Sequence, residues 1–202
     1  ALYPDHLGTM YSGSAVTDYE NTAGYNRDNV PAMIVAYTAA SPDKQVQCIA
    51  YSLDNGRTFT KYPENPVIDS KHIWNSIDTR DPKVFWYKPG KHWVMVLNER
   101  DGHSIYISSN LKEWTYQSHI TGFWECPELF ELPIDGDPNN TKWVMYGATG
   151  TYMLGSFNGK VFKPEMGKYQ YTTGSIYAAQ TFTNMPDGRR IQIGWGRISH
   201  PG

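Results

Sequence analysis

The sequence predicts an all-β fold, namely a propeller made of four-stranded antiparallel blades, and three observations support this prediction. Apolar residues occur in short runs rich in Val, Ile, Tyr, Phe and Trp, which Gly, Asn, Asp and Pro interrupt. Helical periodicity is almost absent, which argues against the helical crossovers of an α/β fold. An internal repeat of about 45–50 residues has the length of one propeller blade.

Eleven segments fit the pattern of β-strands, because they combine β-branched and aromatic residues with turn residues at their ends. No linker or shift in composition divides them, so residues 1–202 are interpreted as a single domain, incomplete at both ends. In chain order, the expected strands are Met10–Val16, Met33–Ala39, Gln47–Leu53, Lys83–Tyr87, Trp93–Asn98, Ser104–Ser109, Leu129–Leu132, Trp143–Ala148, Tyr152–Phe157, Tyr177–Phe182 and Ile191–Trp195.

The first element of the repeat is a strand that ends in serine and is followed by a turn and an aromatic residue. It occurs at residues 51–59, 107–114 and 155–162. The first and third copies contain Asn55-Gly56 and Asn158-Gly159, and Asn-Gly predicts a tight turn with positive φ at both residues.

The second element recurs in the same phase, as Arg80-Asp81-Pro82 and as Glu125-Cys126-Pro127. About four units are therefore present. Equivalent positions of successive blades converge on the central channel, so Asp81, or its neighbour Arg80, is expected to face Glu125 across one pocket. Paired carboxylates are what glycoside hydrolysis requires. Taken singly, an acidic residue beside proline is more often a turn residue, and both interpretations stay open at this point.

Composition argues against several function classes. The net charge is −2 with no long block of one sign, which argues against nucleic acid or an anionic membrane as the main partner. No apolar run is long enough to span a membrane. The two cysteines, Cys48 and Cys126, are expected to be free thiols, and the six histidines lack the spacing of metal ligands, so no metal or cofactor is predicted.

Five motifs, in order along the chain, resemble glycoside hydrolase family 32, the family of invertases, levanases, inulinases and related fructosyltransferases. Arg80-Asp81-Pro82 and Glu125-Cys126-Pro127 are similar to two of its motifs. Of the other three, residues 11–16 and 191–195 are similar to strands of the family that contact the sugar, and residues 177–182 are similar to its Tyr-Ala segment before the next strand. Each motif is weak alone, whereas five in order are strong support.

The resemblance implies a five-bladed β-propeller and retaining cleavage of β-fructofuranosidic bonds in a fructose-containing oligo- or polysaccharide. It assigns the acid/base role to Glu125, with a raised pKa, and transition-state stabilisation to Asp81. Arg80 is expected to bind the sugar and to help keep Asp81 ionised. The family also favours a secreted or periplasmic location. The remaining expected substrate-binding residues are Tyr11, Ser12, Trp124, Tyr177 and Trp195.

The sequence departs from the family in one major respect. The family's nucleophile is an Asp in a Trp-Met-Asn-Asp-Pro-Asn-Gly segment, which has no counterpart here. Asp137-Pro138-Asn139-Asn140 is similar in letters, but it follows the Glu125 motif and is interpreted as hairpin chemistry. We therefore expect a truncation at the N-terminus, and a chain that is inactive alone because the covalent step needs its nucleophile.

Other functions remain compatible with these residues. They are a fructosyltransferase, a five-bladed hydrolase of arabinan or xylan, and a non-catalytic carbohydrate-binding propeller that resembles invertase. Trp74 is a candidate for sugar stacking or for anchoring a loop. The choice among sucrose, inulin and levan depends on the loops around the pocket mouth, and the oligomeric state stays open.

Overall fold

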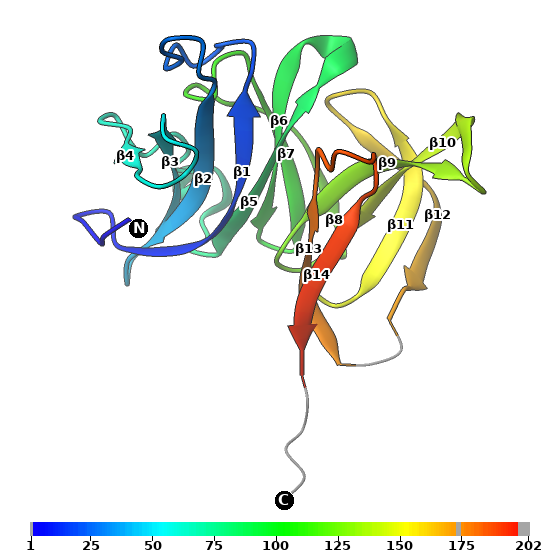
Figure 1. The fold of residues 1–202 in the computed structure, drawn as a ribbon. Helices are drawn as coiled ribbons and strands as arrows, with labels where there is room; N and C mark the ends of the chain where they lie inside the picture. Colours follow the sequence, from blue (N-terminus) through cyan, green and yellow to red (C-terminus); the bar gives the residue numbers. More distant parts are fainter. Residues whose placement is uncertain (1, 173–174, 198–202) are drawn as a thin grey trace, which may run out of the picture.

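A computed structural model describes residues 2–172 and 175–197, and these residues form antiparallel sheets with very little helix (Figure 1). Three of the described sheets have four strands and one has two. Strands that are neighbours in a sheet are also neighbours in the chain, which is the arrangement of propeller blades. Within the described ranges, no helix is long and apolar enough to cross a membrane.

The elements have the following bounds. Blade 1 contains β1 (Thr9–Asp18), β2 (Ala32–Ala40), β3 (Gln45–Ser52) and β4 (Thr60–Lys61). After the short helix α1 (Lys71–Trp74), blade 2 contains β5 (Thr79–Tyr87), the 3-10 turn η1 (Lys88–Gly90), β6 (His92–Glu99), β7 (Gly102–Ser108) and β8 (Thr115–Thr121). Blade 3 contains β9 (Glu128–Ile134), β10 (Asp137–Tyr146), β11 (Thr151–Phe157) and β12 (Phe162–Gln170). The two-stranded sheet contains β13 (Ile176–Phe182) and β14 (Ile191–Gly196).

The core lies between adjacent blades, and strand β6 shows why. Side chains alternate along a strand, so Trp93, Met95 and Leu97 belong to the apolar cluster shared with blade 1. Val94 and Val96 point the other way, into the cluster shared with blade 3. A strand that is buried on both faces has to be apolar throughout. The middle strands therefore stand out in the sequence as continuous apolar runs.

All eleven expected strands are present, with ends shifted by a few residues. Three further strands were not expected, and β4, β8 and β12 are each the outermost strand of a blade. Strand β12 is exposed at every position except Phe162. An outer strand that faces water lacks the apolar alternation on which the sequence argument depends. Both cysteines are buried and free, as predicted.

The first strands of the blades meet one another along the centre of the molecule. Ser14 of β1 donates to the carbonyl of Pro82 on β5 at 2.8 Å. Lys83 of β5 forms a buried ion pair with Glu128 of β9 at 2.6 Å. Thr181 of β13 donates to the same carboxylate, also at 2.6 Å. These bonds identify β1, β5, β9 and β13 as the inner strands, as the propeller prediction requires.

Inner strands β1, β5 and β13 share a β-bulge, in which three residues advance against two of the neighbouring strand. In β5 the bulge lies between Arg80 and Lys83, and in β13 between Tyr177 and Gln180. Blade 3 has the same arrangement, since the Ala148 N–H donates to the Glu125 carbonyl at 3.0 Å just before β9. The bulges therefore place corresponding residues of all four sheets at one end of the inner strands.

The strand register at the bulges also shows that the two motifs align one residue differently from what their sequences indicate. Arg80, Glu125 and Tyr177 occupy equivalent positions, and Asp81 is equivalent to Cys126 rather than to Glu125. Asp81 and Cys126 both have positive φ, of 62° and 43°. A bulge re-aims its side chains, so Asp81, which accepts the Cys126 N–H, lies next to the Glu125 segment although the two carboxylates stand one residue apart in the repeat.

The serine-turn-aromatic repeat is held by side-chain oxygens that replace backbone acceptors. Ser52 accepts from the Gly56 N–H at 2.9 Å, and Asp54 Oδ1 accepts from the Thr58 N–H at 2.9 Å. The expected positive φ is confirmed at Asn55 (59°) and Gly56 (80°). In the third copy it is confirmed only for Gly159.

The expectation is wrong for Asn158 because its own side chain closes the turn. Asn158 Oδ1 accepts from the N–H groups of Lys160 and Val161, at 3.0 and 2.8 Å. Such an Asx-type turn needs no left-handed residue at the asparagine. The same side-chain role therefore falls to Asp54 in blade 1 and to an asparagine in blade 3.

Replacing Asp54 with alanine is expected to lower the Tm of the full-length protein by a few degrees, and Asp54→Asn by less. Hydrogen bonds from Thr58 hold the pKa of Asp54 well below its usual range. Its contribution is therefore present above the unfolded pKa and is lost as the pH falls below about 4. Thermal unfolding at neutral and acid pH measures this. Equal Tm values for the parent and Asp54→Ala at neutral pH would contradict it.

Candidate active site

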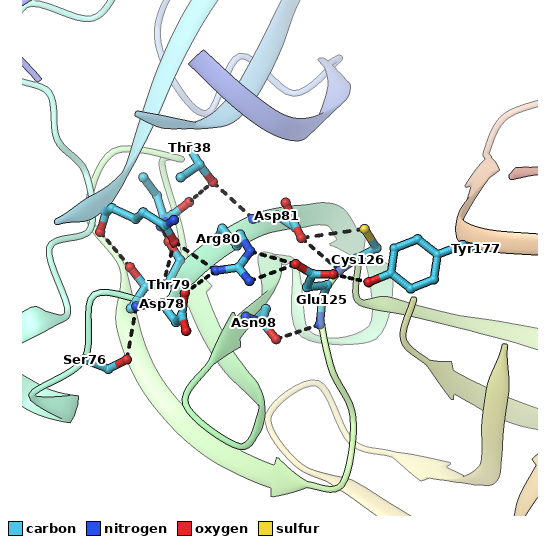
Figure 2. Close-up of polar contacts among 12 residues, drawn as sticks. Thr38, Ser76, Asp78, Thr79, Arg80, Asp81, Asn98, Glu125, Cys126 and Tyr177 are labelled. Atoms are coloured by element: carbon cyan, nitrogen blue, oxygen red, sulfur yellow. Dashed lines mark hydrogen bonds and ion pairs between the residues drawn. The ribbon is translucent and has the colours of Figure 1, made fainter. Parts of the chain in front are cut away.

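Arg80, Asp81, Glu125 and Tyr177 lie together at the bulge end of the inner strands (Figure 2). Glu125 Oε1 accepts from Arg80 Nη2 at 2.8 Å and from Nε at 3.3 Å. Glu125 Oε2 accepts a hydrogen bond from the Tyr177 hydroxyl. Arg80 of blade 2 and Tyr177 of the sheet of β13 and β14 thus both bind the carboxylate of Glu125, which lies just before β9 of blade 3.

The backbone that presents Glu125 is held in an unusual conformation. Glu125 and Cys126 have φ values of 49° and 43°, in the left-handed region that side chains with a Cβ rarely adopt. The Glu125 N–H donates to Asn98 Oδ1 at 2.8 Å, and the Cys126 N–H donates to Asp81 Oδ2 at 3.0 Å. Such conformations persist only where the surroundings enforce them, and here two side chains of blade 2 do so.

Asp81 is almost fully buried, with 6% of its surface exposed. Its N–H donates to Thr38 Oγ1 at 3.1 Å, and Thr38 in turn donates to Gln47 at 2.8 Å. Burial raises the pKa of Asp81, while the Cys126 N–H and the charge of Arg80 act in the opposite direction. Arg80 therefore favours the ionised form of Asp81 as predicted, but burial outweighs it.

Arg80 is fixed from several sides. Its Nη1 donates to Asp78 Oδ1 at 2.5 Å and to Gln45 Oε1 at 3.3 Å. Its guanidinium carbon lies 5.4 Å from the centre of the Trp124 ring. The direct ionic partners of Arg80 are therefore Asp78 and Glu125, which the motif alone did not reveal.

The expectation of a raised pKa at Glu125 is wrong for this structure. Partial burial raises the pKa of Glu125, but the hydrogen bonds from Tyr177 and Arg80, together with the charge of Arg80, lower it further, and the net shift is downward. The chemical task of an acid does not reveal the partners that set its pKa. The contacts of Glu125 in this structure thus favour its carboxylate form.

The other expected substrate-binding residues lie around this centre with different degrees of contact. Trp124 is 37% exposed and stacks beside Arg80. Tyr11 is 52% exposed and lies with Ser12 in the bulge of β1, a strand that is bonded to the bulge of β5 through Ser14. Trp195 pairs with Tyr177 across β13 and β14 and is 73% exposed. Tyr177 is thus the one of these five for which the structure records a bond to Glu125.

Two ambiguous features of the sequence are resolved by the structure. The ring of Trp74 lies 4.9 Å from the ring of His119 and 5.7 Å from that of Tyr116, so it anchors the loop before β5. Residues 137–140 begin β10 in the β9–β10 hairpin, where the Asn139 N–H donates to Asp137 at 2.9 Å. The hairpin interpretation of that segment is confirmed.

Replacing Tyr177 with phenylalanine is expected to move the alkaline limb of the pH profile of kcat/KM to higher pH. Burial and the bond to Glu125 raise the pKa of Tyr177 to about 12, so the phenol remains a donor. Its removal raises the pKa of Glu125, and the protonated acid then persists to higher pH. The profile of the full-length protein measures this, and a limb that stays in place or moves down would refute it.

Comparison with known proteins agrees with the motifs. Residues 1–201 match the sequence profile of the Glycosyl hydrolases family 32 N-terminal domain. A levanase from Bacillus subtilis is 45% identical, over 96% of this chain and 32% of the levanase. Invertase 1 from Saccharomyces cerevisiae is 37% identical, over 92% of this chain and 39% of the invertase. The chain thus spans about a third to two fifths of these relatives.

Solved structures show the same fold. A fructofuranosidase from Schwanniomyces occidentalis, solved in complex with fructose, has a TM-score of 0.85 and 35% identity, covering 97% of this chain and 42% of that one. An exo-inulinase from Aspergillus awamori has a TM-score of 0.80 and 33% identity, covering 93% and 45%. The predicted class, an all-β five-bladed propeller with four-stranded antiparallel blades, is confirmed. The chain belongs to glycosyl hydrolase family 32, and its residues 1–201 match the N-terminal domain of that family.

Proposed function

We propose that the full-length protein hydrolyses β-fructofuranosidic bonds with retention, using Glu125 as acid/base and Asp81 as transition-state stabiliser. The observation that carries the proposal is the junction of Glu125, Arg80 and Asp81: Arg80 is ion-paired with Glu125, and Asp81 accepts a hydrogen bond from the N–H of Cys126, the residue after Glu125. Retention also requires a nucleophilic carboxylate. The proposal therefore concerns the whole protein, with residues 1–202 as part of its catalytic domain.

Glu125 has to be protonated when the leaving oxygen departs, although Arg80 and Tyr177 favour its carboxylate in this structure. Arg80 is the group whose contacts can change so that the pKa of Glu125 rises. If the hydroxyls of a bound fructosyl unit take over hydrogen bonds of the guanidinium, the pKa of Glu125 rises where the acid is needed. After the leaving group has gone, the carboxylate form is the base that activates water.

Asp81 acts on the fructosyl ring itself. A buried carboxylate held by the Cys126 N–H cannot rotate freely, so its charge is fixed in place before the reaction. Positive charge develops on the ring in the oxocarbenium-like transition state. A fixed carboxylate therefore binds the transition state more tightly than the substrate, which is what raises kcat. Trp124, Tyr11, Ser12 and Trp195 are also proposed to contact sugar.

The test is fructose release by the full-length protein from sucrose, inulin and levan, with arabinan and xylan as matched polymers without fructose. Release from at least one of the three fructosides, and from neither pentose polymer, is expected. The anomeric form of the first product, followed by NMR, reports retention. No release from any fructoside by a folded protein would refute the proposal and favour a carbohydrate-binding propeller, and pentose release would favour the arabinan or xylan alternative.

A further inference from the structure

Two fully buried polar side chains lie behind the acid/base residue. Asn98 on β6 and His103 on β7 are partners in the strand register, and neither has any exposed surface. Asn98 Oδ1 accepts a hydrogen bond from the Glu125 N–H at 2.8 Å (Figure 2). Burying a pair of polar side chains costs free energy unless they are hydrogen-bonded. The position of this pair behind Glu125 suggests that it has a role at that residue.

His103 faces the same segment from the other strand. Its ring stacks on Phe123, with centroids 5.3 Å apart and planes inclined by 13°. Burial lowers the pKa of His103 to about 3, while the nearby backbone of Glu125 opposes that shift. The imidazole is therefore neutral. The imidazole thus packs on Phe123, two residues before Glu125, and lies near the backbone of Glu125 itself.

The polar atoms of this pair are not otherwise engaged within the part of the chain that the structure describes. Both ring nitrogens of His103, and Nδ2 of Asn98, are buried without a hydrogen-bond partner there. Buried polar groups are nearly always paired in folded proteins. The recorded hydrogen bond of the Asn98 side chain is therefore the one that it accepts from the backbone N–H of Glu125, the proposed acid/base.

We propose that Asn98 and His103 are positioning residues that hold the Glu125 backbone in its left-handed conformation, and so aim its carboxylate at Arg80 and the substrate. Asn98 fixes the N–H of Glu125, and His103 supports Phe123 and the Glu125 peptide from below. The inference rests on the proposed function only in its catalytic consequence. The backbone constraint itself is independent of which sugar is cleaved.

The same hairpin contains a matched polar pair that points away from Glu125. Ser104 is the residue after His103, is equally buried, and bonds to His119 Nδ1 at 2.9 Å. Since side chains alternate along a strand, Ser104 lies on the face of blade 2 opposite to His103. Ser104→Ala therefore removes a buried polar contact of the same hairpin without touching the acid/base segment.

The experiment compares Asn98→Leu, Asn98→Asp, His103→Phe and Ser104→Ala in the full-length protein. Leucine keeps the branched shape and the number of side-chain heavy atoms of Asn98 and removes the acceptor. Aspartate keeps an acceptor, and phenylalanine keeps the ring stack on Phe123 without the nitrogens. For sucrose, kcat is expected to fall by about 30-fold in Asn98→Leu and about 10-fold in His103→Phe, with KM within about twofold. Asn98→Asp is expected to recover most of the loss, and Ser104→Ala to keep the parental kcat.

Amide hydrogen exchange of the segment 123–126 provides a readout that does not depend on activity. Exchange is expected to accelerate in Asn98→Leu and to stay at the parental rate in Asn98→Asp and Ser104→Ala. Parental exchange and parental kcat in Asn98→Leu would overturn the inference, as would equal losses in Asn98→Leu and Ser104→Ala. An inactive parent would refute the proposed function alone, because the exchange result would still decide whether the pair holds Glu125.

Discussion

Replacing Glu125 with glutamine is expected to lower kcat for sucrose by about 10³-fold in the full-length protein. Glutamine keeps the shape of the side chain: its carbonyl oxygen can still accept from Arg80, and its amide N–H can donate to the hydroxyl oxygen of Tyr177. It cannot donate a proton to the leaving oxygen, and general acid catalysis contributes roughly 10²–10⁴-fold. Steady-state release of fructose measures the loss.

The leaving group provides the control for this interpretation. A fructoside of nitrophenol needs little protonation as its bond breaks, so the first step should be nearly parental in Glu125→Gln with that substrate. The exposed carboxylate of Asp101, on the turn between β6 and β7, offers a matched variant, Asp101→Asn, with parental activity expected. If Glu125→Gln lost equal activity on sucrose and on the nitrophenyl fructoside, Glu125 would not be the acid.

Replacing Asp81 with asparagine is expected to lower kcat by about 10²–10³-fold on both kinds of substrate. The charge on the fructosyl ring develops whatever the leaving group is, so an activated substrate cannot compensate for a missing stabiliser. Asparagine Oδ1 can still accept the Cys126 N–H, and the backbone of the acid/base segment should therefore stay in place. Single-turnover release of nitrophenol isolates this step.

The two substitutions should combine by less than the product of their separate effects. Asp81 and Cys126 are joined by a hydrogen bond, and Cys126 is covalently next to Glu125, so the two sites are not independent. The double variant Glu125→Gln with Asp81→Asn is the measurement, in comparison with each single variant. Full additivity would mean that the bond between the blades does not couple the two carboxylates.

Much of the fold could be predicted because its inner and middle strands leave a direct pattern in the sequence. The middle strands that contain Trp93-Val94-Met95 and Trp143-Val144-Met145 are apolar at successive positions, and the repeat gives their spacing. Strands β4, β8 and β12 were missed because they lie at the outside of their blades, where water accepts polar side chains on either face. The bulges were missed too, because an inserted residue in one strand shows only against its partner strand.

The site was predictable as a set of motifs but not as a set of contacts. Tyr177 was expected to bind sugar, and its bond to Glu125 joins residues 52 positions apart. Asn98 ends a predicted strand, and a polar residue there could have signalled a buried role, but nothing in the sequence names Glu125 as its partner. The prediction of a raised pKa at Glu125 was wrong for the same reason, because this pKa depends on partners that the tertiary structure supplies.

The recurring bulge has a consequence for how the residues of such a site can diversify. One backbone feature, copied with the blade, presents Arg80 in one copy, Glu125 in the next and Tyr177 in the one after. A guanidinium, a carboxylate and a phenol thus stand at corresponding places of a duplicated unit. Substitution at any one of them changes the chemistry of the pocket while the neighbouring copies preserve the scaffold, so new specificities can arise there by single codon changes rather than by remodelling of the fold.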